Sequence, residues 1–395
     1  FMSNVGTIAR GIRTPIIKTG DDLEKIVIDS LMKAKETEGF EFHDRDIIAI
    51  TEAVVGIADG YYVTYDDVAK DIKNKYPKGH IGIVFPTPFS RNRFGPFLKG
   101  FAKGANKLTM LISYPNDEVG NKLFDEKLLD KWGVDPSKDI LTEDKYQEYF
   151  GGYVHEFTGV DYIKYFREVV DAEDCEVEFI FSNNPKVILD YTKDILVANI
   201  HNRKKTKEIL KEEASTIYTL DEIMNESVDG SNYNKDYGLL GSNRATDDKL
   251  KLFPYGKQDF VDGIQKKMKE LTGKTLEVMI YGDGAFKDPV GGIWELADPC
   301  VSPYYTKGLE GTPNELKLKY FADNKFKNIH GEELAKAMKE EIKNKENLFG
   351  KMASLGTTPR RYIDLIGSLC DLISGSGDKG TPIVFIQDYF KTYAD

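Results

Sequence analysis

Short apolar runs alternate along the chain with longer stretches in which apolar side chains recur every three or four residues. The short runs are bounded by polar residues and predict buried strands at 47–50, 81–85, 108–112, 177–181, 195–200, 276–281 and 383–386. The longer stretches predict helices at 23–31, 161–170, 203–212, 258–271, 332–344 and 359–373. This alternation predicts a mixed α/β (α+β) protein in which helices cover the sheets.

Two stretches interrupt the pattern, at 231–254 and 286–314. Both are rich in Gly, Pro, Asn and Asp. This composition is more typical of functional loops than of linkers, so both stretches are candidates for carrying site residues.

Composition narrows the class of protein. The 395 residues include 54 basic and 65 acidic side chains, which gives a formal net charge of −11. We expect no nucleic-acid or membrane partner, because both attract basic surfaces. The length predicts two or three domains, or one core with a large insertion. Three dispersed cysteines without a CxxC pair, and no apolar run of about 18 residues, predict a cytoplasmic protein.

Two acidic residues on glycine-bordered turns are the first candidates for chemistry. Asp229 lies in the segment Ser-Val-Asp-Gly-Ser-Asn (227–232), and Asp283 lies between two glycines after the predicted strand 276–281. Two such carboxylates suit a hard divalent cation if the fold brings them together, and such a cation suits a phosphate-bearing substrate. A turn-stabilising role is the alternative for each, and at Asp229 the spacing alone favours it.

Three loops are candidates for binding anions. The Gly-rich loop 374–381 lies between a predicted helix and a predicted strand, where its N–H groups suit phosphate, although it is not a Walker A loop. The segments 356–361 and 90–93 each carry two arginines, which bind an anion or simply meet solvent. The histidines lack metal-ligand spacing, and we expect structural roles for them: His43, His80, His155, His201 and His330.

Several of these segments, in this order, resemble the coenzyme F420-0:L-glutamate ligase family. Residues 15–23 match its P-x-I-K-x-G-D-D-L motif, residues 46–60 resemble its strand and following turn, and residues 228–232 match its V-D-x-S-N. Residues 281–283 stand where the family has a strand ending in S-D-T, and 374–382 resemble its closing nucleotide loop. The similarity covers roughly 10–60 and 200–390. It predicts a γ-glutamyl ligase-like core at 1–60 and 200–395, interrupted by an α/β insertion at 61–199.

The resemblance implies a GTP-dependent ligase that adds L-glutamate to a small-molecule acid through an acyl phosphate, with Mg²⁺ or Mn²⁺ and as a homodimer. It implies metal ligation by Asp229 and Asp283, with Gly284 and Ser376 at a second metal position, and it assigns no catalytic side chain. The implied nucleotide contacts come from both ends of the core: Thr14, Pro15, Ile16, Ile17, Glu52, Ala53, Asn232, Ser374, Gly375, Ser376, Gly377, Asp378, Lys379, Gly380 and Thr381.

The chain departs from the family pattern at three places. A Ser-Lys pair is replaced by Gly56-Ile57, and the family's Thr and Gln are replaced by Gly284 and Ser376. The positive charge of the family's lysine is therefore missing, and the candidates to supply it are Arg91, Arg93, Arg360 and Lys379. Alternatives are a ligase for a different, folate-like acid, a non-catalytic nucleotide-binding homologue, or an unrelated α/β metalloenzyme if the two aspartates lie far apart.

Overall fold

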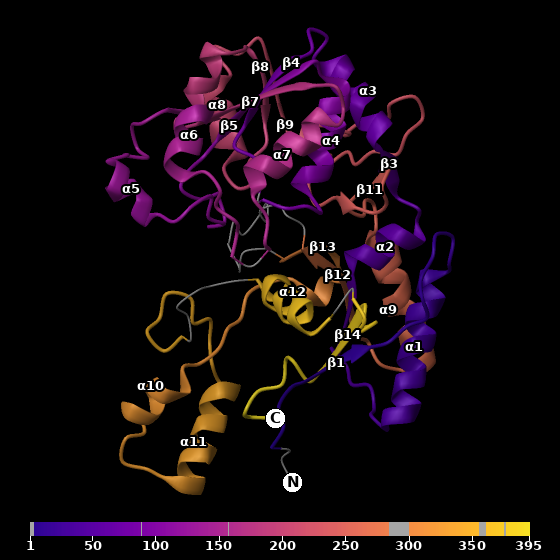
Figure 1. The fold of residues 1–395 in the computed structure, drawn as a ribbon. Coiled ribbons are helices and arrows are strands. Elements are labelled where there is room, and N and C mark those ends of the chain that lie inside the picture. Colours follow the sequence, from indigo (N-terminus) through magenta and orange to yellow (C-terminus); the bar gives the residue numbers. More distant parts are fainter. Residues whose placement is uncertain (1–3, 88, 157, 284–299, 355–360, 375–376) are drawn as a thin grey trace.

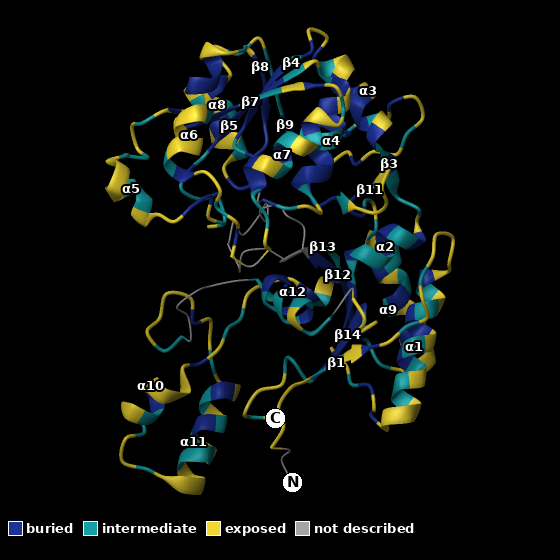
Figure 2. Cartoon of the chain, viewed as in Figure 1, coloured by how far each residue is buried: buried dark blue, intermediate teal, exposed yellow. Residues whose placement is uncertain are grey.

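Three β-sheets and their covering helices make up the described part of the chain in this computed structural model (Figure 1). The structure describes residues 4–87, 89–156, 158–283, 300–354, 361–374 and 377–395. Figure 2 shows that the central strands are buried and that the helices expose their outer faces.

The first sheet combines both ends of the chain. Its strand order is β1 (Ile8–Ile12), β14 (Ile383–Gln387), β2 (Ile47–Thr51), β12 (Glu277–Asp283) and β13 (Cys300–Tyr305). Helices α1 (Leu23–Glu38) and α9 (Gln258–Thr272) cover one face, and α12 (Tyr362–Ile373) covers the other. Side chains of β2 therefore alternate between two apolar layers: Ile48 and Ile50 pack towards α1, whereas Ile47 and Ala49 pack towards α12. Burial on both faces is the reason that this strand reads as a continuous apolar run.

The second sheet is parallel apart from one short edge strand. Its order is β6 (Leu141–Thr142), β7 (Glu176–Phe181), β5 (Lys107–Ile112), β4 (His80–Val84), β8 (Asp194–Val197) and β9 (Thr216–Thr219). Helices α3 (Tyr65–Lys75), α4 (Phe94–Gly104) and α7 (Tyr162–Asp171) pack on one face. The short helix η1 (Pro185–Asp190) and α8 (Arg203–Leu210) pack on the other. Numbered along the chain, the five parallel strands have the spatial order 3-2-1-4-5, which is a doubly wound topology.

A small ribbon lies between these two sheets in Figure 1. It pairs β10 (Asn243–Arg244), β11 (Lys249–Lys251) and β3 (Tyr62–Thr64). The remaining elements are α2 (Glu52–Ala58), α5 (Lys127–Trp132), α6 (Glu143–Phe150), η2 (Leu220–Glu222), η3 (Lys307–Leu309), α10 (Leu318–Asp323) and α11 (Gly331–Lys343). The last two form a small apolar cluster of their own.

The predicted fold class is confirmed, and each predicted strand and helix contains an observed element of the same type. Several boundaries differ: α1 continues to Glu38, beyond the predicted 31, and two other boundaries lie three residues from the prediction for a clear reason. The strand predicted at 195–200 ends at Val197, because the N–H groups of Ile200 and His201 donate to the Glu118 carboxylate instead of to a neighbouring strand. The helix predicted from Pro359 begins at Tyr362, because Arg361 has extended backbone with ψ of 152°.

A strand also replaces part of a predicted loop. Residues 300–305 of the stretch 286–314 form β13, which pairs with β12, because its tyrosines pack against the sheet. Within the described residues, no helix has both the length and the apolar character needed to cross a bilayer.

Candidate active site

One edge of the first sheet gathers several of the segments that the motifs single out. The strand register aligns Ile12 with Ile383, Ile383 with Ile50, and Ile50 with Ile280. The chain continues beyond this row at the C-terminal ends of β1, β2 and β12, and it enters the row at the N-terminal end of β14. Segments 13–17, 51–53, 377–382 and 281–283 therefore lie at the same edge. This is the edge at which open α/β sheets bind ligands.

Backbone contacts hold these segments together. The Thr51 N–H donates to the Pro382 carbonyl at 2.9 Å, which joins the end of the Gly-rich loop to the residue before Glu52. Thr381 packs against Gly11, where an added Cβ would lie 3.1 Å from the threonine side chain. The N-terminal segment and the C-terminal loop therefore meet, although they are separated by most of the chain.

A cleft opens beside this junction, between β1 and α1. Its volume is about 820 Å³, and Thr14, Pro15 and Thr381 line it. Three basic side chains also line it, Arg10, Arg13 and Lys33, together with two acidic ones, Asp29 and Glu38. The basic side chains outnumber the acidic ones, and the cleft lies next to the Gly-rich loop, so a polyanion such as a triphosphate suits it.

The other residues of these segments have simpler surroundings. Ile16 is exposed, and Ile17 packs against the core under α1. Gly377, Asp378, Lys379 and Gly380 form an exposed turn, and the Ser374 N–H caps α12 by donating to the Cys370 carbonyl. Gly375, Ser376, Gly284 and Arg360 lie outside the described residues.

Glu52 is buried at the start of α2, directly after β2. Its carboxylate pairs with the Lys251 ammonium of β11 at 2.6 Å, and both side chains are only 5% exposed. Gly282 of β12 packs against Glu52 so closely that an added Cβ would lie 2.1 Å from the glutamate Cγ. Ala53 follows, half-buried, in the first turn of α2.

Lys251 is a site residue that the motifs do not reveal. Its methylene stem lies over Gly56, where an added Cβ would be 3.1 Å from the lysine Cδ. Gly56, which stands where the family has a serine, therefore leaves space for the Lys251 side chain from β11. The available sequence signal is a lone lysine within the apolar run Leu250 to Phe253.

The motif at 15–23 shapes the turn that leads to α1. The Asp22 carboxylate accepts the Lys25 N–H at 3.0 Å and caps the helix, and Asp21 accepts the Lys18 N–H at 2.7 Å. Thr19 donates to the Ile57 carbonyl at the end of α2 at 3.0 Å. These acidic residues stabilise loop and helix ends, and one oxygen of each accepts a backbone N–H group.

The turn at 228–232 is closed by its serine. The Ser231 N–H donates to the Val228 carbonyl at 2.9 Å, and the Ser231 hydroxyl accepts the Val228 N–H at 3.0 Å. Asp229 is exposed, has a positive φ of 50°, and pairs with Lys70 of α3 at 3.1 Å. Asn232 donates to the Tyr62 carbonyl at 2.9 Å, and Tyr62 is the register partner of Lys251. Asn232 is thus linked to the Glu52 pair, whereas Asp229 contacts a helix of the neighbouring unit.

Asp283 ends β12 at the same edge as Glu52, and its side chain lies outside the described residues. Two described carboxylates, Glu52 and Asp229, are each paired with a lysine. A cation shared by Asp229 and Asp283 therefore stays a prediction.

Another acidic cluster lies at the opposite edge of the sheet. His43, Asp46 and Asp388 place ligand atoms within 4.8 Å of one another. Both oxygens of Asp46 accept backbone N–H groups, from His43 at 2.7 Å and from Asp388 at 2.9 Å, and burial raises the pKa of this carboxyl group. These contacts give the cluster a structural explanation, since they join the start of β2 to the end of β14.

The arginine candidates divide between two places. Arg91 and Arg93 lie in the loop between β4 and α4, in the part of the chain built around the second, mostly parallel sheet (the parallel-sheet unit). Arg361 pairs with Asp364 in the first turn of α12. Arg361 therefore does not simply meet solvent, because its side chain is 21% exposed and forms an ion pair with buried Asp364.

The fold and this edge define a class: an α/β protein with a basic, glycine-bordered site assembled from both ends of the chain. The chain belongs to the F420-0:Gamma-glutamyl ligase family, which matches residues 11–388. No curated protein matches the sequence significantly. The family confirms the resemblance drawn from the motifs and makes the chain a member of a family of ligases. The matched range includes residues 61–199, the predicted insertion.

Proposed function

We propose that this chain is a GTP-dependent ligase that joins L-glutamate to the carboxylate of F420-0 or a related acid. The observation that carries the proposal is the convergence of segments 13–17, 51–53 and 377–382 on one sheet edge beside a basic cleft. Family membership supplies the reaction class.

The proposed reaction has two steps. A carboxylate oxygen of the acid attacks the γ-phosphorus of GTP, and GDP leaves with the electron pair of the broken bond. The glutamate amine then attacks the acyl carbon, loses a proton, and expels phosphate to form the amide. Transfer of this kind depends on positioning and charge stabilisation more than on a protein nucleophile.

The chain's own residues would supply that positioning. In this proposal, Arg13 and Lys33 neutralise the triphosphate in the cleft, and backbone N–H groups of 377–381 contact its oxygens. Lys251 holds the Glu52 carboxylate in place beside the end of β12, where the acid would approach. Mg²⁺ or Mn²⁺, held through Asp283 with Asp229, is an expectation from the family pattern and would neutralise phosphate charge.

The test is a reaction of the purified chain with GTP, Mg²⁺ or Mn²⁺, L-glutamate and F420-0. We expect GDP and phosphate in equal amounts and a product heavier by one glutamyl residue, measured by chromatography and mass spectrometry. ATP in place of GTP, and omission of the metal with added EDTA, are the controls. GTP binding without GDP formation across a panel of acids would overturn the ligase proposal in favour of a non-catalytic nucleotide-binding protein.

The cleft gives a separate prediction. Arg13→Ala and Lys33→Ala should each weaken GTP binding roughly tenfold, because each removes a cation from a site for a polyanion. Lys319→Ala, an exposed lysine on α10, is the control. Isothermal titration calorimetry measures the effect, and unchanged affinity in both cleft variants would place the nucleotide elsewhere.

A further inference from the structure

The parallel-sheet unit has its own topological switch point. From β4 the chain moves through β5 and β7 on one side, then returns to β8 and β9 on the other. Strands β4 and β8 are neighbours, but the helices that follow them, α4 and α8, lie on opposite faces of the sheet. The loops after β4 and β8 therefore separate at the carboxyl ends of the strands, which is where open α/β sheets bind ligands.

Buried acceptor atoms without partners gather at this switch point. Thr87, in the loop after β4, is 2% exposed, and Asn199, in the loop after β8, is 4% exposed. Among the described residues, neither the Thr87 hydroxyl nor the Asn199 Oδ1 has a hydrogen-bond partner, and the same holds for Oδ1 of half-buried Asn116 after β5. The Asn199 amide nitrogen already donates to the Thr206 hydroxyl at 3.3 Å, which leaves the oxygen as the unused group. Native proteins leave few buried polar atoms unpaired, so three on adjacent loops point to a ligand.

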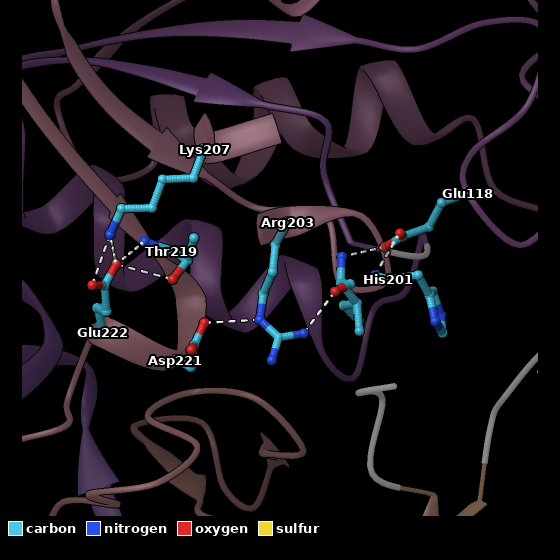
Figure 3. Close-up of polar contacts among 8 residues, drawn as sticks. Glu118, His201, Arg203, Lys207, Thr219, Asp221 and Glu222 are labelled. Carbon is cyan, nitrogen blue, oxygen red and sulfur yellow. Dashed lines mark hydrogen bonds and ion pairs between the residues drawn. The ribbon is translucent and has the colours of Figure 1, made fainter. Parts of the chain in front are cut away.

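Two charged groups at this edge, Glu118 and Arg203, are already engaged, as Figure 3 shows. The Glu118 carboxylate accepts the Ile200 and His201 N–H groups at 2.6 and 2.9 Å. Arg203 donates to the Ile200 carbonyl at 2.7 Å and to Asp221 at 2.9 Å. An internal carboxylate thus occupies the backbone donors that a phosphate would use, so phosphate recognition is disfavoured here. The unused acceptors favour an uncharged group with hydroxyl or amide N–H donors.

This switch point is connected to the proposed ligase site. The Arg244 N–H of β10 donates to the Asn92 carbonyl in the loop after β4 at 2.7 Å. The neighbouring Asn243 is the register partner of Lys251, which pairs with Glu52. The small ribbon therefore joins the switch-point loop to the ligase edge through contacts of described residues.

We propose that the switch-point loops after β4 and β8 bind the hydroxyl- or amide-bearing, uncharged part of the acid substrate, while its carboxylate lies at the ligase edge. This inference rests on the proposed function. Because Thr87 and Asn199 are covered in this structure, the two loops part when the acid enters.

Thr87→Val is the decisive variant, because it removes one hydroxyl and keeps the shape of the side chain. That hydroxyl has no internal partner, so stability should not fall. The Kd for F420-0 in the absence of nucleotide, measured by calorimetry, should rise roughly five- to tenfold, the value of one lost hydrogen bond. Thr87→Ser should bind like the wild type, and Asn116→Ala should weaken binding in the same direction.

Thr192→Val is the matched control. Thr192 lies at the opposite end of the same sheet, where its hydroxyl accepts the Asp194 N–H at 3.2 Å. Hydrogen exchange should also slow in segments 85–93 and 198–202 when F420-0 is added. Unchanged Kd in Thr87→Val and Asn116→Ala, with no change in exchange, would overturn the inference.

The two proposals fail in different ways. If the wild type turns over GTP and glutamate while Thr87→Val leaves the KM for the acid unchanged, the ligase stands and the switch-point site does not. If Thr87→Val weakens F420-0 binding but no amide forms under any condition, the site stands and the ligase does not.

Discussion

At the scale of single residues, the buried ion pair of Lys251 and Glu52 is the contact whose loss we expect to lower the stability of the fold most. Lys251→Met leaves an uncompensated buried carboxylate, so we expect a loss of roughly 3–5 kcal/mol in unfolding free energy. The double variant Lys251→Met with Glu52→Gln should recover most of it, since no buried charge remains. Urea unfolding measures both, and Lys70→Met, which breaks the exposed pair with Asp229, should cost less than about 1 kcal/mol. Equal losses at the two lysines would contradict this account.

A second residue-scale prediction concerns pH. Burial raises the pKa of Glu118 to about 7, although its two backbone donors and Arg203 oppose this shift. The folded state therefore binds a proton between its ordinary pKa of 4.5 and about 7 that the unfolded state has lost, so stability falls as pH rises through this window. The contribution is on the order of 3 kcal/mol, and Glu118→Gln should remove this part of the slope. Thermal unfolding from pH 5 to 8 measures it, and parallel curves for the two proteins would refute the assignment.

At the scale of elements, β12 depends on a glycine where it meets α2. A Cβ at Gly282 would lie 2.1 Å from Glu52, next to an irregularity in the pairing of β12 with β13. Gly282→Ala must therefore displace the strand or the glutamate, and we expect a loss of about 1–3 kcal/mol together with weaker GTP binding. Gly6→Ala is the control, because nothing lies within 4 Å of the added atom. A Gly282→Ala protein as stable as wild type would show that the close contact is not maintained in solution.

At the scale of the whole molecule, the first sheet has one edge built for ligand and one edge closed by structural contacts. GTP should slow hydrogen exchange in segments 11–17 and 377–382, because both lie at the site edge. It should leave the region around His43 and Asp388 unchanged, since that cluster closes the opposite edge. Hydrogen exchange measured by mass spectrometry with and without GTP tests this. Protection at the His43 edge instead would show that the nucleotide binds at the opposite edge of the sheet and would contradict the proposed site.

The sequence predicted more of the elements than of their arrangement. The apolar run 47–50 identified β2 because burial on both faces leaves a continuous signal in one short segment. Short or half-polar strands such as β1 and β11 were missed, because their side chains carry little apolar periodicity. The doubly wound order of the parallel sheet was missed as well, since strand order depends on contacts between distant segments.

The sequence by itself determined the fold class, the family motifs and the segments from which a nucleotide site would be built, because these are written in local periodicity and in residues close together along the chain. Only the tertiary structure decided that Lys251 pairs with Glu52 over Gly56, that Asp229 contacts Lys70, and that unpaired oxygens gather after β4, β5 and β8. Each of these results comes from residues far apart in sequence, and their proximity is fixed by sheet register and packing rather than by local pattern.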